Sequence, residues 1–109
     1  MIPTDDTRIA PRKVLRCRAK VVLQAGSALA GKTVDISASG ICVMVDNPLQ
    51  AGQICMIIFE TPIKGVPKQV NVVAKVVYSI LGTDGFRTGF QFSQLTPANT
   101  ALINEIVAS

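Results

Sequence analysis

The sequence predicts an all-β (mainly β) fold, a six-stranded antiparallel β-barrel with a C-terminal α-helix. Three observations support this. Short segments alternate apolar and polar residues with a period of two, turn residues separate these segments, and the last segment changes to a helical period. Six strands in a chain of 109 residues favour closure, because a barrel leaves no strand edge exposed. A chain of this length fits one domain.

The first segment, residues 1–7, has no periodicity and predicts a flexible tail, so the domain is expected at residues 8–109. Pro11 disfavours a helix through the residue before it, and the basic segment around it is expected to form an extended arm. The alternative is a helix that carries its arginines on one face. The net charge is +4, and its concentration in this segment indicates an anionic partner. Six of the eleven basic residues lie here: Arg8, Arg12, Lys13, Arg16, Arg18 and Lys20.

The body of the chain is divided into strands by turn residues. Residues 61–67 include Pro62 and Pro67 and are expected to form a loop, because proline cannot join a central ladder. In the longest strand, the even-numbered residues from Val70 to Tyr78 are expected to share one face. The predicted strands are residues 19–24, 32–37, 40–45, 53–59, 69–79 and 86–92.

The last segment predicts a helix. Thr96 is suited to the N-cap, and Pro97 to the first helical position. Apolar residues then recur on one helical face, which indicates that this face packs against the barrel. They are Leu102, Ile103, Ile106 and Val107.

Composition excludes several kinds of chemistry. The chain has no histidine, so a Ser–His or Cys–His nucleophile is impossible. Cys17, Cys42 and Cys55 are odd in number, widely spaced and in apolar contexts, so we expect reduced core or near-core thiols and no metal site. No apolar run approaches the ~20 residues of a spanning helix, and no signal peptide is visible, so a cytoplasmic protein without membrane insertion is expected. Neither an enzyme nor a cofactor is indicated.

The hairpin of residues 34–45 carries the polar groups of most interest. Asp35 and Ser37 are two apart and are expected to project from the same face of the strand. Gly40 permits a positive φ and close approach of a ligand to the backbone. Taken alone, these are ordinary turn residues that often bond their own backbone.

The arginines upstream add a second set of groups. Arg8 and Arg12 form an RxxxR motif, and Arg12 and Arg16 form another. Guanidinium binds phosphate as a bidentate fork and pairs with the O6/N7 edge of guanine. A carboxylate such as Asp35 accepts hydrogen bonds from the N–H groups of guanine. The two sets together suit a guanine nucleotide, although a solvated basic tail would also explain the arginines.

RxxxR followed after roughly twenty residues by the DxSxxG of Asp35 to Gly40 resembles the PilZ domain family in a single-domain, standalone form. The GFQF of residues 89–92 is similar to the strand that precedes the family's terminal helix. The resemblance implies a bacterial six-stranded barrel with a C-terminal helix that binds the second messenger cyclic di-GMP. The ligand residues that it implies are Arg8, Arg12, Asp35, Ser37 and Gly40.

Two further residues are candidates. Arg16 replaces Arg8 if the motif is Arg12/Arg16, but the proline before Arg12 fits the family better with Arg8/Arg12. Tyr78 falls where some members have an aromatic residue near the guanine, and base stacking contributes ~1–3 kcal/mol. A tyrosine of the barrel core or rim is the alternative.

The expected function is therefore that of a non-catalytic cyclic di-GMP receptor. Its arginine arm would become ordered on the ligand and change the surface offered to an unidentified partner protein, with motility, exopolysaccharide or virulence as the output by family analogy. One alternative is a PilZ-like adaptor that does not bind nucleotide. A small-barrel nucleic-acid binder is a further alternative, disfavoured because aromatic residues make up 5% of the chain and tryptophan is absent.

Overall fold

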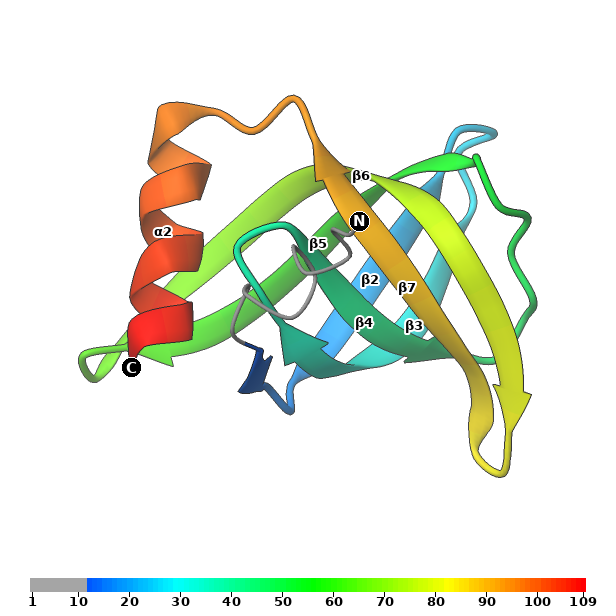
Figure 1. Ribbon diagram of the computed structural model, residues 1–109, viewed down its shortest axis with the longest axis horizontal. Helices are drawn as coiled ribbons and strands as arrows, with labels where there is room; N and C mark the ends of the chain where they lie inside the picture. The colour runs from blue at the N-terminus through cyan, green and yellow to red at the C-terminus, as the bar shows by residue number, and fades with distance from the viewer. Residues whose placement is uncertain (1–11) are drawn as a thin grey trace, which may run out of the picture.

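The computed structural model describes residues 12–109, which form a closed antiparallel barrel with a helix beside it (Figure 1). Six strands pair in the order β3-β2-β5-β6-β7-β4, and pairing of β3 with β4 closes the barrel. The short strand β1 pairs with the end of β3 beyond β2. The expected barrel and C-terminal helix are confirmed. The elements are β1 (Lys13–Val14), β2 (Arg18–Leu23), β3 (Ala28–Ile36), β4 (Gly40–Val45), β5 (Ile54–Ile63), β6 (Val66–Gly82), β7 (Gly85–Ser93) and α2 (Pro97–Ala108).

The expected loop at residues 61–67 is wrong, because β5 and β6 continue through it as a hairpin. Pro62 pairs with Pro67, and Lys64 and Gly65 form the two-residue turn with φ of 55° and 81°. Positive φ at both positions suits a tight hairpin turn. The prolines are tolerated because this part of the hairpin has no further neighbour: β2 pairs with β5 only as far as Phe59.

Strand β3 begins at Ala28, four residues before the predicted start. Residues 28–31 read Ala-Leu-Ala-Gly, a sequence with weak strand preference. Their pairing with β2, from Ala28 opposite Val22 to Gly31 opposite Ala19, makes them a strand. Neighbouring strands supply here the stabilisation that local sequence lacks.

The basic segment is extended from Arg12 onward, so the helical alternative is wrong for the described part; Arg8 lies outside the described residues. Backbone bonds tie this segment to β3, from Leu15 N–H to the Val34 carbonyl and from Thr33 N–H to the Cys17 carbonyl. The buried Thr33 hydroxyl also donates to the Leu15 carbonyl at 2.6 Å and accepts from Cys17 N–H at 2.9 Å. These bonds hold the segment in a fixed place beside the barrel.

The barrel interior follows the predicted alternation, with one register shift in β3, between Thr33 and Asp35, and another in β6. Residues Val70 to Val76 bury their even-numbered side chains, which are at most 1% exposed. Val76 pairs with Phe90 and Tyr78 pairs with Gly89, so Val77 is an extra residue in a β-bulge. The bulge moves Tyr78 out of the core face, and its side chain is 37% exposed. The expectation that Tyr78 shares the buried face of Val76 is therefore wrong.

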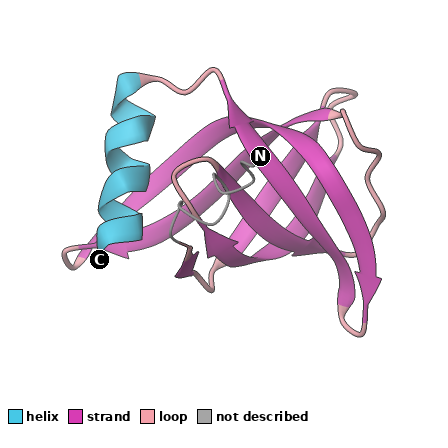
Figure 2. Ribbon diagram, in the orientation of Figure 1, coloured by secondary structure: helices cyan, strands magenta, loops and turns pink. Residues whose placement is uncertain are grey.

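Helix α2 stands at one end of the barrel (Figure 2). The Thr96 hydroxyl accepts a hydrogen bond from Asn99 N–H at 3.1 Å, which confirms the predicted N-cap. Ile103 and Ile106 are buried in the core, and the Asn99 side chain donates to the Asn71 carbonyl of β6 at 2.7 Å. A helix capable of spanning a bilayer is not found in the part of the chain that the structure describes.

Candidate functional site

Four neighbouring strands place one residue each in a row across the outer face of the barrel. Strand pairing aligns Asp35 of β3 with Cys42 of β4, Cys42 with Gly89 of β7, and Gly89 with Tyr78 of β6. We call these four residues the outer row. Three strand spacings separate its ends, a span of about 14 Å. The row places the polar side chains of Asp35 and Tyr78, which are far apart in the sequence, on one face of the barrel.

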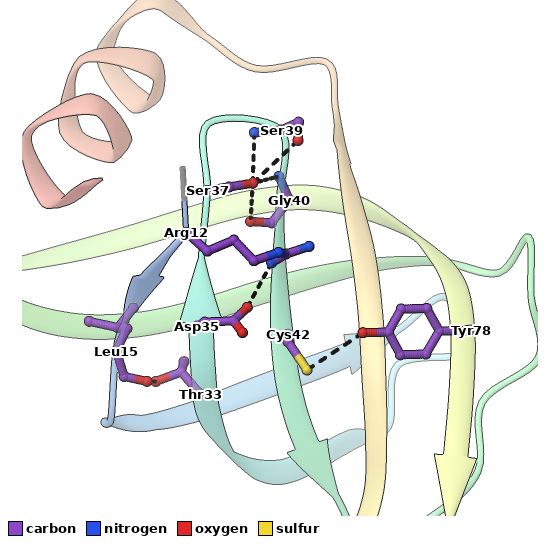
Figure 3. A network of polar contacts seen from close by, with 9 residues as sticks. All are labelled: Arg12, Leu15, Thr33, Asp35, Ser37, Ser39, Gly40, Cys42 and Tyr78. Carbon is purple, nitrogen blue, oxygen red and sulfur yellow. Dashed lines mark hydrogen bonds and ion pairs between the residues drawn. The ribbon is translucent and has the colours of Figure 1, made fainter. Parts of the chain in front are cut away.

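Arg12 lies at the Asp35 end of the outer row. Its guanidinium Nη1 is 2.7 Å from Asp35 Oδ1, and the two form an ion pair and a hydrogen bond (Figure 3). Pairing of Lys13 with Ile36 and of Val14 with Asp35 holds the backbone here, so β1 positions Arg12. The Arg12 side chain is 55% exposed and that of Asp35 26%. An exposed pair of this kind contributes ~0–1 kcal/mol to stability, so neither side chain is needed for folding.

Ser37 has a different role from the one its spacing suggests. It follows β3, is 1% exposed, and turns its hydroxyl into the hairpin tip. Its Oγ accepts hydrogen bonds from the N–H groups of Ser39 and Gly40, both at 3.3 Å, and donates to the Gly40 carbonyl at 3.4 Å (Figure 3). The structure therefore brings Asp35 to Arg12 but leaves the Ser37 hydroxyl inside the turn.

Gly40 begins β4 where that strand meets β7. Its φ is not among the positive values of the described residues, so conformational freedom does not explain the glycine. A methyl group there would overlap the backbone carbonyl oxygen of Phe90. Close contact between two strands of the barrel requires the absence of a side chain at this position.

Tyr78 closes the other end of the outer row. Its ring covers Gly89, where an added Cβ would overlap the ring, and its hydroxyl donates to Cys42 Sγ at 3.9 Å (Figure 3). Burial raises the pKa of the Cys42 thiol above its usual 9.0. Burial also raises the pKa of Tyr78 above 10.0, and the neighbouring Cys42 raises it further while Arg12 lowers it. Both groups therefore stay neutral near pH 7.

A hollow of about 240 Å³ lies over the outer row. Arg12 lines it on one side and Tyr78 on the other, with Ser39 and Gly40 of the hairpin tip between them. The hollow thus has a cation on one side and an aromatic ring on the other, and the cation is bonded to the Asp35 carboxylate beside the hollow. Such a set suits an anionic ligand with flat rings.

The three thiols are free, as expected, but they differ in surroundings. Cys55 belongs to the core, Cys17 is half-buried, and Cys42 is buried under Tyr78 on the outer face. Residues Cys42 and Gly89 were not among the predicted site residues. Alternation with the inward-facing Ile41 and Val43 could have placed Cys42 on the outer face, but the sequence contains no signal that pairs it with Tyr78.

Comparison with known proteins identifies the family. The family model described as PilZ domain matches residues 6–109. The chain belongs to the PilZ domain family. A search of the curated proteins found no match to the sequence.

Solved structures similar to this PilZ chain support the same fold. The Bacillus subtilis inhibitor of motility MotI/DgrA superposes with a TM-score of 0.80 at 16% identity, over 93% of this chain and 49% of that one. The PilZ domain of Escherichia coli YcgR with c-di-GMP gives 0.72 at 18% identity, over 93% and 88%. Klebsiella pneumonia MrkH, in a complex with c-di-GMP, gives 0.72 at 17% identity, over 93% and 51%. The chain thus spans about half of two of these proteins and most of the isolated PilZ domain.

Among the described residues, only one arginine of the RxxxR motifs contacts the DxSxxG motif. Arg12 contacts Asp35, whereas Arg16 lines a separate hollow over β2 and β3. Arg8 lies outside the described residues. Of the seven predicted site residues, Arg12, Gly40 and Tyr78 line the outer-row hollow, and Asp35 is bonded to Arg12.

Proposed function

We propose that this PilZ domain is a non-catalytic receptor for cyclic di-GMP and binds it over the outer row. The ion pair of Arg12 and Asp35 beside the hollow carries the proposal, because it unites one residue of each motif. Two similar structures, those of YcgR and MrkH, are described as containing c-di-GMP, which supports the same ligand class here. As a receptor for this second messenger, the protein would act in the cytoplasm.

Each group has a chemical role in this proposal. Arg12 binds a phosphate or a guanine edge, and Asp35 accepts from guanine N–H groups. Tyr78 offers a ring for stacking, worth ~1–3 kcal/mol per base. Ser37 and Gly40 maintain the hairpin tip against which the ligand rests. The ligand would exchange the Arg12–Asp35 pair for its own contacts with both side chains.

The arginine arm is proposed to complete the site. The hollow of about 240 Å³ is smaller than the ~300–1,000 Å³ that encloses a drug-sized ligand. A dinucleotide resting there would remain largely uncovered, and Arg8 is four residues upstream of Arg12. Ordering of residues 8–11 on the ligand would bring a second guanidinium to the phosphates. The changed surface would then be recognised by a partner protein.

Calorimetric titration of cyclic di-GMP tests the proposal. We expect saturable binding to the wild type and a loss of about tenfold or more in both Arg12→Ala and Asp35→Ala. Both variants should fold, because the pair is exposed and contributes little to stability. Absence of binding to the wild type at tens of micromolar ligand would contradict the proposal and favour an adaptor that does not bind nucleotide.

Arg8→Ala and Arg16→Ala form a matched pair that tests the register of the arginine motif. Each removes one positive charge from the same segment. We expect Arg8→Ala to weaken binding and Arg16→Ala to leave it within about twofold, because Arg16 lines a different hollow. The opposite result would assign the site to Arg12 and Arg16.

A further inference from the structure

A second and larger hollow lies on the outer face of the barrel over β2 and β3. Its volume is about 1530 Å³. Four cationic side chains line it, and all four are exposed. We call it the basic hollow, and its cations are Arg16, Arg18, Lys20 and Lys32.

The cations of the basic hollow are not arranged for stability. Arg18 of β2 lies directly opposite Lys32 of β3 in the ladder, and like charges in that position destabilise a sheet. Among residues 12–109, the ion pairs are Arg12–Asp35 and Lys64–Glu105, so no described carboxylate pairs with Arg18 or Lys32. These two exposed cations are therefore available to an external anion.

Size and lining indicate what kind of anion this is. The volume exceeds the ~300–1,000 Å³ typical of small-ligand pockets, which favours a macromolecular occupant. Met44, which pairs with Lys32, and Ile58, which pairs with Lys20, contribute apolar surface beside the cations. The carboxylates of Asp46, Glu60 and Asp84 also line the hollow and would repel a continuous phosphate backbone. Mixed charge with apolar surface suits a polypeptide better than a nucleic acid.

We propose that the basic hollow docks an acidic segment of a partner protein, one that alternates carboxylate and apolar side chains. The carboxylates meet Arg18, Lys20 and Lys32, and the apolar side chains contact Met44 and Ile58. Both β2 and β3 are paired on each side within the barrel, so recognition is by side chains and not by strand addition. The basic hollow is separate from the proposed nucleotide site and shares none of that site's described residues.

Fluorescence anisotropy with a labelled peptide of alternating Glu and Val residues tests this docking surface. A peptide of alternating Gln and Val is the uncharged control probe. We expect the wild type to bind the acidic peptide saturably, and Arg18→Glu with Lys32→Glu to weaken binding about tenfold or more. The matched control, Lys64→Glu with Lys68→Glu, makes the same change in net charge on the β5–β6 hairpin and should change affinity less than about twofold.

The single variant Lys32→Glu and the double variant provide two independent readouts, stability and nucleotide binding. Lys32→Glu replaces a like-charge pair with an opposite-charge pair, so it should raise the melting temperature while it weakens peptide binding. Cyclic di-GMP titration should be unchanged by Arg18→Glu with Lys32→Glu. A failure of nucleotide binding in the wild type would therefore leave the peptide result interpretable.

Several outcomes would overturn the docking proposal. Absence of acidic-peptide binding, or an equal loss in both double variants, would exclude a specific surface. Tighter binding of duplex DNA than of the peptide, lost in the same variant, would assign the hollow to nucleic acid. A large gain in peptide affinity on deletion of residues 1–7 would assign it to Asp5 and Asp6 of the chain itself.

Discussion

Two glycines, one in the outer row and one beside it, leave room for neighbouring atoms that a side chain would overlap. Their backbone angles do not require glycine. A methyl group at Gly40 would overlap a backbone oxygen of Phe90, which can move only with the β4–β7 ladder. A methyl group at Gly89 would overlap the ring of Tyr78, a side chain that can swing away. The two positions therefore differ in what a substitution displaces, although neither has a positive φ.

A double-mutant cycle on Gly89 and Tyr78 tests the contact between them. Gly89→Ala should destabilise the wild type by about 1–2 kcal/mol, because the added methyl pushes the Tyr78 ring off Cys42. In a Tyr78→Ala background the same change should be neutral or stabilising by up to ~0.5 kcal/mol, because alanine reduces the entropy of the unfolded chain. Urea unfolding of the four proteins measures the coupling.

Tyrosine fluorescence gives a second measurement of that contact. Tyr78 is the only tyrosine and the chain has no tryptophan, so emission reports this ring alone. Gly89→Ala should change the emission by releasing the ring from the barrel wall. Equal effects of Gly89→Ala in both backgrounds, with unchanged emission, would show that the ring does not rest on Gly89.

At the scale of elements, the β3–β4 hairpin uses two of its motif residues to build the turn. The Ser37 hydroxyl binds two backbone N–H groups of the turn, and Gly40 permits close packing against β7. Asp35 alone turns its side chain toward Arg12. The DxSxxG motif is thus partly a folding motif, and its presence does not by itself make every residue a ligand contact.

Ser37→Ala should destabilise the fold, because it leaves the N–H groups of Ser39 and Gly40 without their acceptor. Gly40 is buried whereas Ser39 is exposed, so the loss falls mainly on the Gly40 N–H; an unsatisfied buried group costs about 1–3 kcal/mol, which urea unfolding can resolve. Ser27→Ala is the control, since its exposed hydroxyl has no hydrogen bond to residues 12–109. A stable Ser37→Ala variant with weakened nucleotide binding would instead identify Ser37 as a direct ligand contact.

At the scale of the whole molecule, partial or full burial in the barrel favours the neutral forms of three groups. Burial raises the pKa of Cys42 and Cys55 above 9.0, and that of Tyr78 above 10.0. A group that binds its proton more tightly in the folded state stabilises that state at any pH below its unfolded pKa. This contribution begins to disappear at the unfolded pKa and is lost as pH rises through the folded pKa.

The free energy of unfolding should therefore be insensitive to these groups below about pH 8 and decrease as pH rises past 9.0 and then 10.0. Denaturant titrations across the alkaline range measure the effect. Tyr78→Phe retains the ring but removes its proton, so its stability should decrease less steeply above pH 10.0. An identical pH profile in the variant and the wild type would exclude a contribution from Tyr78.

Local sequence predicts most of the barrel. Alternation identified the inward residues of β6 up to Val76, and the Thr96–Pro97 pair identified the start of α2. It missed the first residues of β3, whose strand structure depends on β2, and it took Pro62 and Pro67 for a loop. In both cases the error arose because a segment becomes a strand when a neighbouring strand pairs with it, and local sequence does not show which strand that is.

The candidate site was predicted less completely than the fold. Motif spacing identified Arg12 and Asp35, and the structure brings them within 2.7 Å. It left open whether Ser37 contacts a ligand or bonds its own turn, and the structure shows the second; it did not indicate that Arg16 lies over β2 and β3. Side-chain direction at a turn depends on which backbone groups need partners, and residue spacing does not contain that information.

The sequence by itself determined the fold class, the family and the pair of charged residues, because period, turn residues and motifs are local properties of the chain. Only the tertiary structure decided the outer row. A one-residue bulge at Val77 shifts Tyr78 from the core face to the surface, and barrel closure aligns it with Gly89, Cys42 and Asp35. Register between strands far apart in sequence is set by the packing of the whole barrel, so no single segment could predict it.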